Sequence, residues 1–151
     1  MAKIKPLKEN ALFKNFSDKE IALLSKYVEE KNIAAPTPLF LENMKGESMF
    51  MVGSGAIKLS KMLSEGEEKT LTTIGPGEFF GEMALIEAGP RSVSAIVIQD
   101  AQVLILKRSG FEQLMEESPT VAVKVVIGIY KSLSDRIRAL SPLIQSMVMG
   151  K

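Results

Sequence analysis

The chain has 151 residues, with 19 basic and 18 acidic side chains and a formal net charge of +1. It contains neither cysteine nor histidine, which excludes disulfides, thiolate or imidazole metal sites, and nucleophiles activated by histidine. The near-neutral charge gives no sign of the basic field that nucleic-acid binding uses. The length predicts a single domain over 1–151, and the composition favours a non-catalytic binding module over an enzyme.

Targeting signals are not recognisable in this sequence. The amino-terminal segment Met1–Pro6 has lysines but no apolar stretch behind them, so it does not resemble a secretory signal. The most apolar stretch, Val121–Tyr130, is interrupted by Lys124 and is too short to span a bilayer. We therefore expect a cytoplasmic protein without membrane contact.

The first third of the chain has a helical pattern. Ser17 and Glu20 have the spacing of a capping box, in which each side chain bonds the other residue's backbone N–H. Apolar residues follow at helical spacing, namely Ile21, Leu24, Tyr27 and Val28. The prolines in Ala34–Pro38 end helical structure, so we expect helices over about 6–32.

The middle of the chain changes to a period of two. Ile57 and Leu59 alternate with Lys58 and Ser60, and turns with glycine recur at Gly55, Gly66 and Gly77. Short strands separated by frequent turns are typical of antiparallel sandwiches and barrels. The pattern predicts an antiparallel β-roll of the jelly-roll or double-stranded β-helix type over about 39–107.

Two helices are predicted after the roll, over about 109–140. Ser109 and Glu112 form a second capping-box pattern, and Ser118–Pro119 supplies an N-cap and a first-turn proline for a longer helix. One apolar stripe runs along that longer helix, made of Val121, Val125, Ile129, Leu133, Ile137 and Leu140. Ser141–Pro142 is expected to end it. The predicted fold class is therefore α+β, an N-terminal helix and a C-terminal helix pair flanking the roll.

One segment within the roll breaks the strand pattern. Residues 77–92 contain a glycine turn, a predicted short helix over 81–88, a Gly-Pro exit and then Arg91. A helix start offers free N–H groups to an anion, and an arginine can add a charge-assisted fork. This combination suits a single phosphate of low charge. A triphosphate would need the lysine-bearing glycine-rich loop that the sequence lacks.

The residues of this segment resemble the phosphate-binding cassette of the cyclic nucleotide-binding domain family. The matching residues are Phe80–Ile86 and Pro90–Ser92, and the step from Glu82 to Arg91 is similar to that in the regulatory subunits of protein kinase A. The family also includes the catabolite activator protein and cyclic-nucleotide-gated channels. The resemblance extends over roughly 10–140, and it implies cAMP or cGMP as the ligand, with no further cofactor and no metal.

The resemblance also implies a role for each cassette residue. Arg91 would pair with the exocyclic oxygens of the cyclic phosphate, and the backbone N–H groups of Met83 and Ala84 would donate to the same phosphate. Glu82 would accept from the ribose 2′-hydroxyl, and Gly81 would allow the ribose to approach the backbone.

The base preference stays open. The hydroxyl of Ser92 would lie near the phosphate and the purine edge, but serine at this place is compatible with both cAMP and cGMP. The base-contacting hydroxyls of the activator would fall near Arg136 and Ile137, where this chain has no hydroxyl. Arg136 is a candidate lid over the base, with a solvated charge beside Asp135 as the plainer interpretation.

The sequence therefore predicts a sensor that binds a cyclic nucleotide and signals by moving its C-terminal helix to an unknown effector. Val123, Val126 and Ile127 widen the apolar face of that helix, which favours a homodimer through it. Little sequence follows Leu140, so no DNA-binding domain is expected. One alternative is a β-roll interaction module that has lost its ligand. A cupin-like enzyme would need histidines for its metal.

Overall fold

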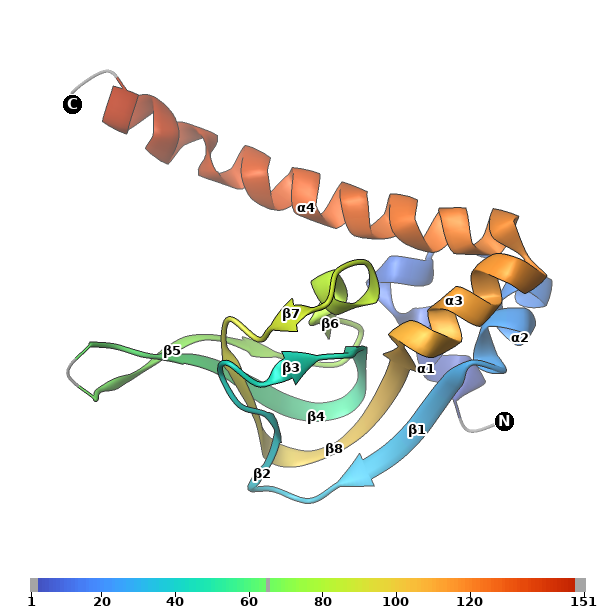
Figure 1. Cartoon of the computed structure of the whole chain (residues 1–151), viewed down its shortest axis with the longest axis horizontal. Helices are drawn as coiled ribbons and strands as arrows, with labels where there is room; N and C mark the ends of the chain where they lie inside the picture. The colour runs from blue at the N-terminus through green and yellow to red at the C-terminus, as the bar shows by residue number, and fades with distance from the viewer. Residues whose placement is uncertain (1–2, 65, 149–151) are drawn as a thin grey trace.

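The computed structural model describes residues 3–64 and 66–148. Short helices open the chain, strands follow, and two helices close it (Figure 1). The helical elements are α1 Ile4–Glu9, η1 Ala11–Phe13, α2 Asp18–Ser25, η2 Glu82–Leu85, α3 Arg108–Glu117 and α4 Pro119–Val148, with η1 and η2 of the 3₁₀ type. The strands are β1 Val28–Ile33, β2 Thr37–Phe40, β3 Lys45–Gly46, β4 Ser48–Met62, β5 Glu68–Ile74, β6 Phe79–Phe80, β7 Gly89–Pro90 and β8 Ser94–Lys107.

The strands form an antiparallel roll around the two long strands β4 and β8. The main sheet has the order β1-β8-β4-β5, with β2 added on β8 and β6 on β4, while β3 and β7 make a small separate sheet. In Figure 1 the long strands curve beneath α4, and the β4–β5 hairpin projects away from α1, α2 and α3. The predicted class, an antiparallel β-roll with helices at both ends of the chain, is confirmed.

Two hydrophobic cores support this arrangement. The first lies where α1, α2, α3 and the beginning of α4 meet the roll, and it includes the buried residues Leu7, Phe13, Phe111 and Val125. The second fills the roll itself, where the rings of Phe40, Phe50 and Phe80 lie 5.3 to 6.0 Å apart between centroids. The second core forms the floor beneath the segment 77–92.

The N-terminal prediction is correct at the capping box and wrong farther along. Ser17 and Glu20 bond each other's backbone N–H groups as expected. The predicted helical region of about 6–32, however, ends at Ser25, and Val28–Ile33 is strand β1, paired along its length with β8. Pairing with a strand far away in the sequence outweighs the local helical spacing, since burial and a ladder of hydrogen bonds reward it.

The C-terminal prediction is correct in its two helices and in the Ser118–Pro119 start of the second, and it is wrong at the cap of the first helix and at the end of the second. Helix α3 begins at Arg108 with Lys107 as its N-cap, and no side chain caps it, so Ser109 lies inside the helix. Helix α4 continues through Pro142 to Val148. A proline removes one backbone hydrogen bond, but α4 is exposed on all sides at this point, so water can satisfy the freed carbonyl. Within the described residues, no helix is long and apolar enough to cross a membrane.

Candidate functional site

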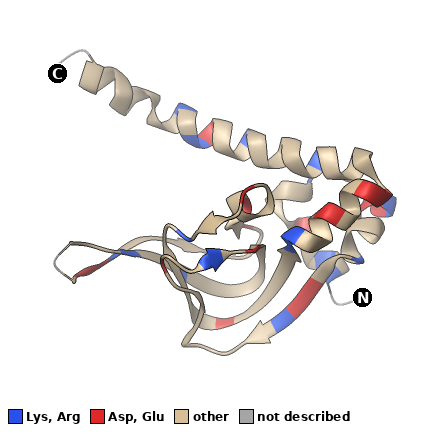
Figure 2. Ribbon diagram, viewed as in Figure 1, with Lys and Arg blue, Asp and Glu red and all other residues tan. Residues whose placement is uncertain are grey.

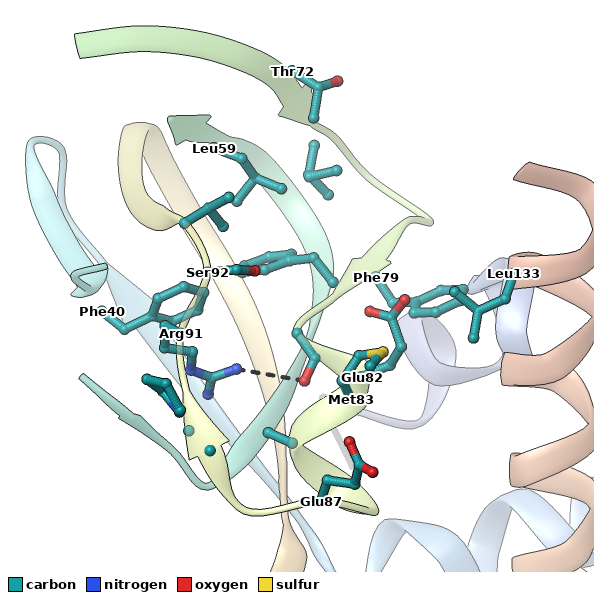
Figure 3. A pocket seen from close by; sticks show the side chains of 18 of the residues that line it. Phe40, Leu59, Thr72, Phe79, Glu82, Met83, Glu87, Arg91, Ser92 and Leu133 are labelled. Atoms are coloured by element: carbon teal, nitrogen blue, oxygen red, sulfur yellow. Dashed lines mark hydrogen bonds between the residues drawn. The ribbon is translucent and has the colours of Figure 1, made fainter. Parts of the chain in front are cut away.

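A cavity of about 950 Å³ opens between the roll, the cassette segment and α4. Figure 3 shows its two walls: Phe40, Leu59, Thr72, Arg91 and Ser92 lie on the side of the roll, while Phe79, Glu82, Met83 and Leu133 lie toward α4. All the residues predicted for the site line this cavity, namely Gly81, Glu82, Met83, Ala84, Arg91, Ser92 and Arg136. The fold thus brings α4 over a segment that is far from it in the sequence.

The cassette helix is shorter than predicted. The expected helix over 81–88 is the single 3₁₀ turn η2, Glu82–Leu85, with Gly81 before it in the left-handed conformation at φ 74°. Runs of 3₁₀ structure stay short because their hydrogen bonds are poorly aligned. The chain then turns into β7, which pairs with β3 through Gly46 and Gly89, and this pairing directs the chain into Arg91.

Arg91 is a half-buried cation that points into the cavity. Its Nη2 donates to the Ser48 carbonyl at 2.7 Å, and its Nη1 makes a long bond of 3.5 Å to the Gly81 carbonyl. The guanidinium lies 4.1 Å above the ring of Phe40. Within the described ranges, its buried Nε has no hydrogen-bond partner, and no carboxylate forms an ion pair with Arg91.

The electrostatics of Arg91 favour an incoming anion. Burial of the guanidinium, and next the positive charge of Arg108, lower the pKa of Arg91 from its ordinary value. An arginine nevertheless stays protonated in proteins. A partly desolvated charge without a counter-ion is unfavourable, so a negative group entering the cavity at this point would be bound with a gain in free energy.

Glu82 ties the cassette to α4. Its side chain is almost completely buried, and its Oε1 accepts a hydrogen bond of 3.1 Å from Nη1 of Arg136. The guanidinium of Arg136 also lies 6.0 Å from the ring centroid of Phe79. Asp135, the neighbour considered for Arg136 in the sequence, pairs instead with Arg138. Arg136 therefore reaches back from α4 to the cavity.

The remaining cassette residues are arranged around these two charges. The Ala84 N–H donates to the Gly81 carbonyl over a long distance of 3.3 Å. Met83 is 60% exposed. Ser92 is exposed at the rim of the cavity, where its carbonyl accepts from Lys61 at 3.0 Å.

The cavity residues that the sequence did not reveal include Phe40, Leu59, Thr72 and Leu133. Each comes from an element distant from the cassette, and no local motif marks them. The alternation around Leu59 was visible, but Ser60 is buried as well, and the pairing of β4 with β5 shifts register between these two residues. Such an irregularity has no signal in this sequence.

The comparisons with known proteins agree with this geometry. A family model described as "Cyclic nucleotide-binding domain" matches residues 30–118. The chain is 34% identical over 116 residues to the "Cyclic AMP receptor protein" of Thermus thermophilus, which covers 77% of this chain and 54% of that protein. It is 29% identical over 146 residues to the "cAMP-dependent protein kinase regulatory subunit" of Schizosaccharomyces pombe, covering 89% of this chain and 34% of that protein. The chain thus spans about half or less of the length of these relatives.

Solved structures give the same result. The "Catabolite Activator Protein" of Thermus thermophilus superimposes with a TM-score of 0.80 at 29% identity, covering 92% of this chain and 63% of that one. The N-terminal domain of a transcriptional regulator from Streptomyces coelicolor superimposes with a TM-score of 0.78 at 27% identity, covering 87% and 94% of the two chains.

The contact between Gly81 and Arg91 makes a prediction about stability. Gly81 and Gly66 both have positive φ, but a Cβ at Gly81 would lie 2.9 Å from Nη1 of Arg91, whereas nothing lies within 4 Å of one at Gly66. Replacing either with alanine incurs a backbone cost of about 1 kcal/mol, and Gly81→Ala must also displace the guanidinium. We expect urea unfolding to show a larger loss for Gly81→Ala than for Gly66→Ala. Equal losses would mean that Arg91 moves freely.

Proposed function

The chain belongs to the cyclic nucleotide-binding domain family, and on this basis we propose that it is a non-catalytic sensor that binds one cAMP or cGMP in the cavity beneath α4. The observation that carries the proposal is Arg91, a half-buried cation in the cavity with an unpartnered Nε and no carboxylate paired with it in the described part of the chain. A cyclic phosphate has one negative charge, which matches one uncompensated guanidinium.

The proposed arrangement places the phosphate between Arg91 and the start of η2. The N–H groups of Met83 and Ala84 donate to the same phosphate, since the existing bond of Ala84 to Gly81 is long and weak. Because Gly81 has no side chain, the ribose can approach the backbone there. The purine then occupies the part of the cavity lined by Leu59, Thr72 and Leu133, with the Ser92 hydroxyl at its edge.

Glu82 connects ligand binding to helix movement in this proposal. The ribose 2′-hydroxyl and Arg136 both use the buried carboxylate of Glu82, so a bound nucleotide changes the contact that holds α4 over the cavity. The first half of α4 is anchored independently, because Lys124 bonds Glu20 at 2.7 Å and the Asn15 carbonyl at 3.0 Å. We therefore propose that the part of α4 beyond Leu133 moves, as a shift between two populated states.

An apolar stripe along α4 supports a homodimer. Apolar residues alternate in steps of three and four along the whole helix, namely Val123, Val126, Tyr130, Leu133, Ile137, Leu140, Ile144 and Met147. All except Leu133 are exposed. This is a heptad pattern with mainly β-branched residues at one core position and leucines prominent at the other, the combination that favours a parallel two-stranded coiled coil. No charged residue follows Arg138 in the described part of α4 (Figure 2), so like-charge repulsion does not oppose pairing there.

Ligand binding is tested by calorimetric titration with cAMP and with cGMP, after unfolding and refolding the protein to remove any nucleotide carried through purification. We expect saturable binding of one nucleotide per chain. Arg91→Ala should weaken it by about a hundredfold or more, the equivalent of about two charge-assisted hydrogen bonds. The control is Arg138→Ala, which removes an exposed arginine outside the cavity. If neither nucleotide binds the wild-type chain, the sensor is refuted, and an interaction module without ligand becomes the better explanation.

Helix movement is tested with two spin labels, for which the chain is well suited because it contains no cysteine. Cysteines at the exposed positions Thr70 and Gln145 report the distance between the β4–β5 hairpin and the end of α4, with unlabelled chains added in excess to suppress signals between copies. Saturating nucleotide should change the distance distribution. Arg136→Ala should produce part of that change without ligand, and Arg138→Ala should not. An unchanged distribution at saturation would contradict a moving α4.

Dimerisation is tested by sedimentation velocity. We expect the wild-type chain to sediment as a dimer and Leu140→Glu to sediment as a monomer, because a charge in the apolar seam would be desolvated on pairing. Gln145→Glu is the matched control, since it adds the same charge to α4 outside the two core positions of the heptad. A wild-type monomer, or equal dimers in all three proteins, would disprove pairing through this face.

A further inference from the structure

The start of helix α3 is an unfavourable place for the residue that occupies it. Arg108 is the first residue of the helix and follows Lys107, so two cations stand at the end where the helix dipole favours anions. No side chain caps this helix, and its first turn contains no acidic residue. When a residue conflicts with its local structure in this way, its tertiary contacts are expected to explain why it stands there.

The side chain of Arg108 is engaged by two backbone carbonyls of the phosphate cassette and its support. Its Nε donates to the Ala84 carbonyl at 3.0 Å, and its Nη2 donates to the Gly46 carbonyl at 2.7 Å. Its own backbone N–H donates to the Glu47 carbonyl at 2.8 Å. The side chain of Arg108 forms no ion pair with a carboxylate among residues 3–64 and 66–148.

These two carbonyls belong to the two arms that converge on the cavity. Ala84 lies in η2, the arm that offers N–H groups. Gly46 lies in β3, which pairs with β7 just before Arg91, and the Arg91 N–H bonds the Met44 carbonyl at 2.6 Å in the turn before β3. The arms are tightly packed, because a Cβ on Gly46 would lie 3.1 Å from Nε of Arg91 and 3.2 Å from the Ala84 Cβ.

We propose that Arg108 is a positioning residue that holds η2 and the strand leading to Arg91 at the spacing the phosphate requires, and that it joins both to the start of α3. The inference rests on the proposed function. Arg108 is not among the residues that line the cavity, so it acts on the ligand through Ala84, Gly46 and the field that it exerts on Arg91. A guanidinium can bridge two carbonyls at once because its donors form a rigid fork, whereas an ammonium on a flexible stem holds such a pair poorly.

The experiment compares Arg108→Met, Arg108→Lys and the control Lys107→Met in titrations with the nucleotide that binds the wild type more tightly. Lys107→Met removes a neighbouring charge whose partner is Glu29 on the surface. We expect Arg108→Met to weaken nucleotide binding by about tenfold or more, the effect of losing hydrogen bonds from a charged donor. Arg108→Lys should recover only part of this loss, and Lys107→Met should bind like the wild type.

A second measurement separates positioning from general destabilisation. In a background of Arg91→Lys, where the phosphate grip is already impaired, Arg108→Met should cause a smaller further loss than it does alone, because residues that act through one site are not additive. The inference is overturned if Arg108→Met lowers only thermal stability and leaves affinity unchanged, if Arg108→Lys binds like the wild type, or if the losses add fully. Failure of the wild type to bind either nucleotide would instead refute the proposed function itself.

Discussion

A half-buried guanidinium with no counter-ion among the described residues is the constraint on which the rest of this structure depends. Arg91 is held in place by the carbonyl of Ser48, by the ring of Phe40 and by the absence of a side chain at Gly81. None of these groups neutralises its charge, and the neighbouring Arg108 adds a second one. The fold therefore keeps a cation partly desolvated, at a cost in stability, where an anion can reach it.

The parts of the site that are contiguous in sequence could be predicted, and the parts assembled by the fold could not. Gly81, Glu82 and Arg91 could be recognised by their residue types and by their spacing along the sequence. Phe40 and Leu133 reach the same cavity only through strand pairing and helix packing. The same distinction explains the strand at Val28–Ile33, whose partner lies more than sixty residues away in β8, and the contacts of Arg108, which join α3 to carbonyls of η2 and β3.

Helix α4 has more apolar surface than one face of a monomer can bury. Val121, Val125 and Ile129 pack into the first core, and a different set of residues forms the heptad seam. Leu133 belongs to both the seam and the wall of the cavity. The sequence predicted that Pro142 would end this helix, but the helix continues past it. Pro142 lies on the side away from the apolar stripe, so it interrupts neither that stripe nor the face that packs into the first core.

In the proposed sensor, the single carboxylate of Glu82 would set an adjustable threshold for nucleotide binding. If the contact with Arg136 and the nucleotide compete for it, then the affinity for nucleotide depends on how firmly the distal half of α4 is held. Thermodynamic linkage requires that nucleotide binding change the holding of α4 by the same free energy as the holding of α4 changes nucleotide binding. A protein that grips the end of α4 would therefore set the nucleotide concentration at which the sensor responds, without touching the cavity, and different partners would tune one domain to different signal levels.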